Sequence, residues 1–245
     1  MASVHNGETE SMLLATLVQL VGLAASALTV ECLVTDDAHS EIIRKYLVAA
    51  KSEALAPRAA AVEVTIQASV PKLKRQATLR ALRITSAAGT VTYTVLNSCG
   101  DAMIKREVIA RYLAAESQTR ATVETAITPF NYQFQPKGVI EKESRQVYVF
   151  HLSPRRKKVG LFRGELQVDG RTGLPIHESG QFIKSPSVFI KRISFTRDYV
   201  ARGWFDVPVH IHSTVESRIV GRVELDIEFA DPSVSNAMEV TPNAE

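Results

Sequence analysis

Two alternating runs flank a basic turn in residues 147–169, which read VYVFHLSPRRKKVGLFRGELQVD. Their apolar positions recur at even spacings, at Phe150, Leu152, Phe162, Leu166 and Val168. Side chains two residues apart lie on the same face of a β-strand, so each run predicts a strand with one apolar face. Pro154 and the four cations after it fit the turn between them.

The same pattern continues to the end of the predicted domain. From Gln146 onward the chain predicts six strands, at 147–152, 159–168, 174–184, 188–200, 207–215 and 219–229. Further apolar positions on these strands are Phe182, Ile193, Phe195, Ile211, Leu225 and Ile227, and the alternate positions include His177, Asp198, His210, His212 and Asp226. Long strands joined by short turns predict an antiparallel meander with one apolar and one polar face.

The first half of the chain mixes helices with strands. Apolar side chains recur every three or four residues in 42–50, behind Asp36 and Asp37, and again in 104–113, behind Asp101. Both patterns predict amphipathic helices with an aspartate at the N-terminus.

Alternation in the first half predicts four more strands, at 62–70, 78–85, 90–96 and 130–135. The first contains Val64 and Ile66 on its apolar face, and the last places three aromatic side chains on one face. A change of phase near Ala81 predicts a β-bulge. The threonine-rich segment 119–128 fits either a strand or a loop.

The sequence predicts about ten strands but only two helices. A sheet with one polar face must cover its other face. Two helices are few for that purpose, so the sheet either curls into a barrel or leaves apolar surface for a ligand. The same side chains also fit a filled, packed core.

Residues 36–230 form one predicted domain, and the polar segment 231–245 is predicted to be a loose tail.

Composition and motifs narrow the classes of function. The 245 residues carry a net charge of +3, too small to make nucleic acid the default partner. The chain contains no Gly-x-Ser-x-Gly elbow and no glycine-rich phosphate loop. We therefore expect no enzymatic activity and no cofactor.

The N-terminus has the pattern of an export signal. Residues 12–30 carry no charge, and Ala25-Ser26-Ala27 follows the apolar run, so we expect cleavage after Ala27. The first Lys or Arg is Arg44, so the positively charged segment that usually precedes the apolar run of a signal peptide is missing. An uncleaved membrane anchor and a buried helix are the alternatives. If the protein is exported, Cys32 and Cys99 lie in an oxidising compartment. There they could form a disulfide with each other, or both could remain free thiols, and the sequence does not decide between the two.

Two local clusters could bind ligands. His210 and His212 share a strand face and could meet a metal, but no third ligand is identifiable in the sequence, so we expect two solvated histidines and no metal. Arg155, Arg156, Lys157 and Lys158 are candidates for contacts with anionic head groups, and a solvated turn is the simpler interpretation.

Several segments resemble the bacterial outer-membrane lipoprotein-sorting protein family, which has the Lol fold. They are the run 147–169, Lys184-Ser185-Pro186-Ser187-Val188-Phe189-Ile190-Lys191-Arg192 and Val220-Gly221-Arg222-Val223-Glu224-Leu225. The resemblance covers roughly residues 38–230. It implies an α+β fold in which a strongly curved antiparallel sheet, an unclosed barrel, has two or more helices covering its concave face.

The resemblance also implies a function. Carriers of this family hold the acyl chains of a lipoprotein on the concave side, so we expect a monomeric periplasmic protein that binds a lipid or an acylated protein and touches membranes transiently. If the leader is not cleaved, the protein would stay membrane-associated. The residues expected to line the cavity are Val64, Ile66, Phe150, Leu152, Phe162, Leu166, Val168, Phe182, Ile193, Phe195, Ile211, Leu225 and Ile227. The alternative is an envelope sensor or assembly partner that uses the sheet as a docking surface without lipid.

Overall fold

The computed structural model describes residues 37–52, 60–86, 90–118, 124–186, 188–202 and 205–230. The predicted leader, Cys32 and the predicted tail lie outside these residues. The chain divides into two compact units, Met1–Arg44 and Lys45–Glu245. The described part of the first unit is the beginning of a helix over residues 37–52, in which Glu41 and Arg44 form an ion pair of 2.6 Å.

The second unit consists mainly of strands. Its elements in chain order are β1 (Ala60–Val70), η1 (Pro71–Leu73), β2 (Arg75–Thr85), β3 (Val91–Gly100), α2 (Ala102–Ile104), η2 (Lys105–Ile109), α3 (Ala110–Gln118), β4 (Tyr132–Lys142), β5 (Arg145–Pro154), β6 (Phe162–Asp169), β7 (Pro175–Phe182), β8 (Ile190–Arg202), β9 (Phe205–Ser217) and β10 (Gly221–Phe229). The two helices and the ten strands predicted from the alternation are therefore present.

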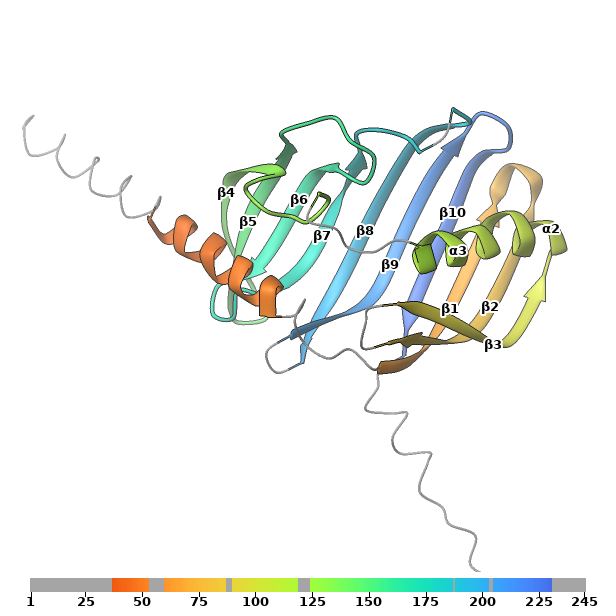
Figure 1. Cartoon of the computed structure of the whole chain (residues 1–245), viewed down its shortest axis with the longest axis horizontal. Helices are drawn as coiled ribbons and strands as arrows, with labels where there is room; N and C mark the ends of the chain where they lie inside the picture. The colour runs from red at the N-terminus through yellow and green to blue at the C-terminus, as the bar shows by residue number, and fades with distance from the viewer. Residues whose placement is uncertain are drawn as a thin grey trace, which may run out of the picture. The chain divides into compact units, whose positions relative to one another are not determined.

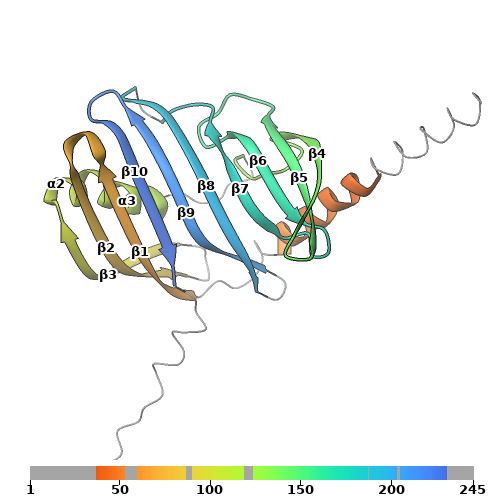
Figure 2. The same ribbon diagram turned by 180° about the vertical axis from the view of Figure 1, so that it is seen from behind.

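All ten strands form one antiparallel sheet in the order β3-β2-β1-β10-β9-β8-β7-β6-β5-β4. The edge strands β3 and β4 do not pair with each other, so the curved sheet stays open (Figures 1 and 2). The predicted fold class, an unclosed antiparallel sheet with helices, is confirmed. The predicted bulge is confirmed as a shift in register between Arg80 and Ala81.

The helical run α2-η2-α3 covers one end of the inner face of the sheet (Figure 1). It begins at Asp101, whose side chain accepts hydrogen bonds from the backbone of Met103 (2.9 Å) and Ile104 (3.1 Å) and so caps the helix as predicted. The middle turn, η2, is π-helical. In an α-helix, residues five apart point about 140° away from each other, whereas a π-turn brings them to one side. Ile104 and Ile109 are accordingly both buried against β1, β2 and β10.

The other helix contributes to the second unit from Lys45 onward. The ring of Tyr46 is buried and lies 6.5 Å from that of Phe134 on β4. Lys45 Nζ donates a hydrogen bond of 3.3 Å to the backbone oxygen of Gly170, in the turn between β6 and β7. This part of the helix therefore packs on the β4 end of the sheet.

Strand β4 differs from its prediction. The strand was expected at 130–135 but runs from Tyr132 to Lys142, with a shift in register between Pro136 and Gly138. Phe130 precedes the strand and is exposed, so it does not share a face with buried Tyr132. The charged second half of β4 was missed because an edge strand exposes most of its side chains and needs no apolar alternation.

A pair of glycines brings β6 and β7 close together. Gly164 lies directly opposite Gly180, and a Cβ atom at Gly164 would lie 1.9 Å from the backbone oxygen of Ser179. We expect Gly164→Ala to lower the free energy of unfolding by about 2–3 kcal/mol, because backbone must move to make room. Denaturant unfolding followed by circular dichroism measures the loss. Ser179→Ala, on the opposite face of β7, is the matched control, and equal stability of the two variants would contradict the prediction.

The turn between β6 and β7 depends on a buried carboxylate. Asp169 Oδ1 accepts hydrogen bonds from the backbone of Arg171 (2.9 Å) and Thr172 (2.7 Å) and from the Thr172 hydroxyl (3.0 Å). Burial alone would raise the pKa of Asp169, but these bonds hold the pKa below its ordinary value of 3.8.

The lowered pKa of Asp169 predicts a pH dependence of stability. A depressed pKa in the folded state contributes stability above 3.8, and this contribution is lost as the pH falls through the folded-state pKa. We expect Asp169→Asn to cost about 1–2 kcal/mol at neutral pH and progressively less on acidification below 3.8. Urea unfolding of both proteins across this pH range tests the expectation. A difference that stays constant with pH would refute it.

Candidate functional site

The candidate site is the inner face of the sheet, and its residues follow from the strand registers. One row of directly paired residues crosses seven strands from β1 to β5, at Ile66, Ile227, Ile211, Arg197, Glu178, Leu166 and Phe150. Since alternate residues of each strand share a face, this row fixes which side chains point inward. The thirteen predicted cavity residues all occupy inward positions by this alternation.

Burial divides the thirteen residues into two groups. Ten are buried: Val64, Ile66, Phe150, Leu152, Phe162, Leu166, Val168, Phe195, Leu225 and Ile227. Phe182, Ile193 and Ile211 are partly exposed. At the β1, β2 and β10 end the buried residues form a packed core under α2-η2-α3. The partly exposed ones lie on β7, β8 and β9, which makes this middle part of the inner face the accessible part.

We call this part the inner strip and define it as the partly exposed Phe182, Ile193, Arg197, Ile211 and Val215, together with the buried Phe195. Three aromatic rings anchor it, with centroids 4.9 Å apart for Phe162 and Phe195, 5.3 Å for Phe182 and Phe195, and 6.5 Å for Phe162 and Phe182. Gly180 lies beneath them, and a Cβ atom there would be 2.6 Å from the Phe162 ring. The glycine therefore provides the space in which the rings pack.

An ion pair interrupts the apolar row. Arg197 Nη1 lies 3.2 Å from Glu178 Oε2 and donates to the hydroxyl oxygen of Tyr199 at 3.1 Å. The Glu178 side chain is only 7% exposed and that of Arg197 is 38% exposed. Burial lowers the pKa of Arg197, but the neighbouring Tyr199 and Glu178 outweigh it and raise the pKa. The guanidinium is therefore a permanent cation.

The guanidinium of Arg197 is not saturated with hydrogen bonds. Its Nε atom is buried without a hydrogen-bond partner. Its central carbon lies 5.7 Å from the centroid of the Phe195 ring, within the range of a cation–π contact. The inner strip thus combines an aromatic wall with one partly exposed cation. Such a surface can bind an apolar chain and contact an anionic group.

A second polar cluster fastens α3 to the sheet. Glu116 on α3 accepts hydrogen bonds from Arg83 Nη2 (2.8 Å) and Nε (3.0 Å) on β2, and from the hydroxyl of Tyr93 on β3. Burial, with added contributions from Glu116, raises the pKa of both Tyr93 and Tyr112. Both tyrosines stay neutral donors, and the cluster has a structural role.

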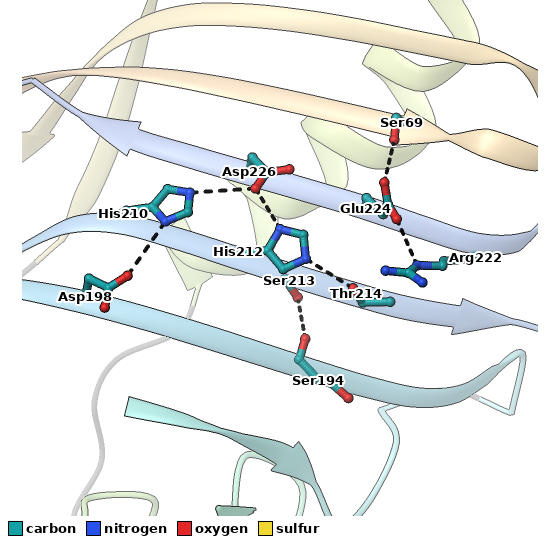
Figure 3. A network of polar contacts seen from close by, with 10 residues as sticks. All are labelled: Ser69, Ser194, Asp198, His210, His212, Ser213, Thr214, Arg222, Glu224 and Asp226. Carbon is teal, nitrogen blue, oxygen red and sulfur yellow. Dashed lines mark hydrogen bonds and ion pairs between the residues drawn. The ribbon is translucent and has the colours of Figure 1, made fainter. Parts of the chain in front are cut away.

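The outer face carries a row of histidines and aspartates (Figure 3). The contacts run from His177 Nδ1 to Asp198 (2.7 Å), from Asp198 to His210 Nδ1 (3.8 Å), from His210 Nε2 to Asp226 (3.6 Å) and from Asp226 to His212 Nδ1 (2.6 Å). Within the described ranges, no group of three or more His, Cys, Asp or Glu side chains is placed to hold a metal ion. The two predicted histidines therefore pair with carboxylates across strands, a contact that the sequence does not reveal.

The basic turn has mainly internal partners. Arg155 Nε donates to the backbone oxygens of Pro129 (2.8 Å) and Tyr132 (3.2 Å). Arg156 donates to Asn131 Oδ1 (2.8 Å) and covers the Phe130 ring, and Lys158 pairs with Glu124. These contacts fasten residues 124–132 to the β5–β6 turn. Contact of the turn with anionic head groups stays a prediction, and Lys157 is the cation best placed for it.

Sequence reasoning missed the two most informative residues of the site. Glu178 and Arg197 were not recognised as inward-facing because charged side chains are expected on the polar face. The signal was their phase. Glu178 lies two positions from Gly180 and four from Phe182, and Arg197 lies two positions from Phe195.

Comparisons with known proteins give structural matches only. The chain resembles a LolA superfamily protein from Nitrosomonas europaea, at 14% identity and a TM-score of 0.34, over 78% of this chain and 91% of that one. A DUF1329 family protein from Desulfovibrio piger matches at 11% identity and a TM-score of 0.36, over 77% and 90%. A chain in the complex of Pseudomonas aeruginosa MucA and MucB matches at 12% identity and a TM-score of 0.27, over 85% and 100%.

The first of these matches belongs to the family that the sequence resembles. All three are similarities of backbone structure, and they say nothing about function. No protein-family model matches the sequence. No curated protein matches it either.

Two further features concern the surroundings of the site. In the described part of the chain, no helix combines the length and apolar character needed to cross a membrane. Cys99, near the end of β3, is exposed and pairs with no other cysteine among the described residues. Because Cys32 lies outside the described residues, the pairing of the two cysteines stays open.

Variants of the Arg197–Glu178 pair are expected to differ in their free energy of unfolding. Arg197→Ala would remove the cation that lies 3.2 Å from the buried Glu178 carboxylate, at a cost of about 2–4 kcal/mol after allowance for the exposure of Arg197. The double variant Arg197→Met, Glu178→Leu removes both charges, and we expect it to lie within about 1 kcal/mol of the parent. Chemical denaturation of the three proteins measures both values. A double variant less stable than Arg197→Ala would overturn this account.

Proposed function

We propose that this protein is a non-enzymatic binding protein of the bacterial envelope that holds an apolar chain, such as the acyl chain of a lipid or an acylated protein, on its inner strip. The observation that carries the proposal is a partly exposed apolar wall, Phe182, Ile193 and Ile211, on a face whose remaining candidate residues are buried. Burying each CH₂ group of a bound chain against this wall would contribute about 0.8 kcal/mol before losses. A periplasmic, monomeric protein without a cofactor fits this role.

The chemistry of the strip favours an amphiphile with an anionic head. Arg197 is the cation of the strip row, and its side chain is 38% exposed, so that part of it can meet an acceptor. The aromatic rings around it suit an aliphatic chain. A carboxylate or phosphate joined to an acyl chain would satisfy both parts of the surface.

Binding of a fluorescent fatty acid tests the proposal. The wild-type protein should bind it saturably, and Ile211→Gln should weaken binding at least about tenfold because it places an amide on the apolar wall. Ile211 is a better choice than Phe162 or Phe195, which are buried and whose replacement would disturb folding. Thr196→Gln, on the outer face of β8, is the matched control and should bind like the wild type.

Two outcomes would count against the proposal. One is a folded wild-type protein that shows no saturable binding, and the other is an Ile211→Gln variant that binds as tightly as Thr196→Gln. The first outcome would favour the alternative, a docking module for an envelope protein. The edge strands favour this alternative, since β3 exposes Val95 and Leu96 and β4 exposes Val139 and Ile140. Unpaired edges with exposed apolar side chains can accept a strand from a partner.

A further inference from the structure

Four turns lie along one edge of the sheet. Antiparallel pairing brings η1 and the β5–β6, β7–β8 and β9–β10 turns to the same ends of their strands, which form the upper edge in Figures 1 and 2. We call this the turn edge and define it by the described residues of 71–74, 155–161, 183–189 and 218–220. The inner strip does not include any of them.

Exposed apolar side chains gather at the turn edge. Val188 is 79% exposed, Phe189 57% and Ile219 69%. We call these three residues the apolar tip. Leu73 and Val159, in the neighbouring turns, are also exposed. Large apolar side chains that cluster in exposed turns mark a surface that something else covers.

Hydrogen bonds hold the apolar tip in a fixed arrangement. The backbone N–H of Arg218 donates to the Phe189 oxygen (2.9 Å), and Arg218 Nε donates to the Val188 oxygen (3.0 Å). The backbone N–H of Ile219 donates to Ser217 Oγ (3.1 Å). The β7–β8 and β9–β10 turns are therefore joined, and they present their three apolar side chains as one patch.

The apolar tip is surrounded by positive charge. Five exposed lysines lie in or next to the turns of this edge, at Lys72, Lys74, Lys157, Lys184 and Lys191. Two carboxylates at the same edge, Asp101 and Glu124, are paired with Arg75 and Lys158. The lysines thus leave an excess of positive charge around the tip.

We propose that the turn edge docks on the surface of an anionic lipid bilayer. The tip would enter the boundary between head groups and acyl chains, and the lysines would lie against the phosphates. Three side chains on two turns form too small a patch for a stable protein interface, which needs about 800 Å² from each partner, but they suffice for shallow insertion aided by charge. This inference does not depend on the apolar ligand proposed for the inner strip.

Flotation with vesicles tests the docking edge. The wild-type protein should float with vesicles made of equal parts phosphatidylcholine and phosphatidylglycerol, and much less with phosphatidylcholine alone. The triple variant Val188→Ser, Phe189→Ser, Ile219→Ser should bind the anionic vesicles at least about tenfold more weakly. The matched control is Val139→Ser, Ile140→Ser, Val200→Ser, which removes three exposed apolar side chains outside the turn edge and should bind like the wild type.

The charged part of the edge has its own variants. Lys184→Gln and Lys191→Gln should each weaken binding to anionic vesicles by about fivefold, and added salt should weaken wild-type binding. Lys137→Gln and Lys142→Gln, at exposed positions of β4, are the matched controls and should have little effect.

Three outcomes would overturn the proposal: a wild-type protein that does not float with anionic vesicles, a tip variant that binds like its control, or lysine variants equal to theirs. Weaker vesicle binding in the lysine variants but not in the tip variant would indicate an electrostatic contact without insertion of the tip, and this too would overturn the proposal. Circular dichroism establishes that each variant is folded. The fatty-acid probe separates the two proposals, since the tip variant should still bind it and Ile211→Gln should still float with vesicles.

Discussion

The pairing of β1 with β10 holds the sheet together. Strands β1–β3 and the meander β4–β10 meet along this ladder, because the edge strands β3 and β4 do not pair with each other. The register runs from Val64 opposite Phe229 to Ser69 opposite Glu224. A slip by one residue would move Val64 and Ile66 to the polar face and break the core beneath the helical run. The alignment of β1–β3 with the inward rows of β4–β10 therefore depends on this ladder.

The Arg197–Glu178 pair is not needed for the stability of the fold. In a buried row, two well-packed apolar side chains are often as stable as an ion pair or more stable. The other members of the row, such as Ile211 and Leu166, are apolar. The charged pair lies where β7 and β8 meet, beside the strip of partly exposed side chains. Stability alone therefore gives no reason for a charged pair at this position, whereas contact with the proposed anionic ligand would make use of the cation.

Local patterns in the sequence were sufficient to locate the ten strands and most of their apolar faces, because alternation depends on neighbouring residues only. Contacts between distant segments were not predictable. The pairing of Glu178 with Arg197 requires the register across the β7–β8 turn, and the internal partners of Arg155 and Arg156 come from residues 124–132. The π-turn in the helical run leaves no clear periodic signal, since its apolar spacing of five matches neither regular helix nor strand.

Small errors in strand boundaries concealed the apolar tip. The alternation predicted strands from residues 188 and 219, which would have made Val188, Phe189 and Ile219 ordinary strand residues. The strands begin two residues later, at Ile190 and Gly221, and the three side chains lie in turns instead. Boundaries are the least certain part of a sequence-based assignment because the ends of strands lack the packing that imposes alternation.

The two apolar surfaces lie along the same strands. Phe189 at the tip precedes Ile193 of the inner strip by four residues, which corresponds to about 13 Å along an extended chain. The helical run α2-η2-α3 contains 17 residues and is about 25 Å long, whereas ten strands extend over about 43 Å. One run of this length cannot cover the whole inner face, and it packs on the β1, β2 and β10 end. The strip on β7–β9 and the tip at its end therefore lie within the reach of one long acyl chain, which could pass between them without crossing the polar outer face.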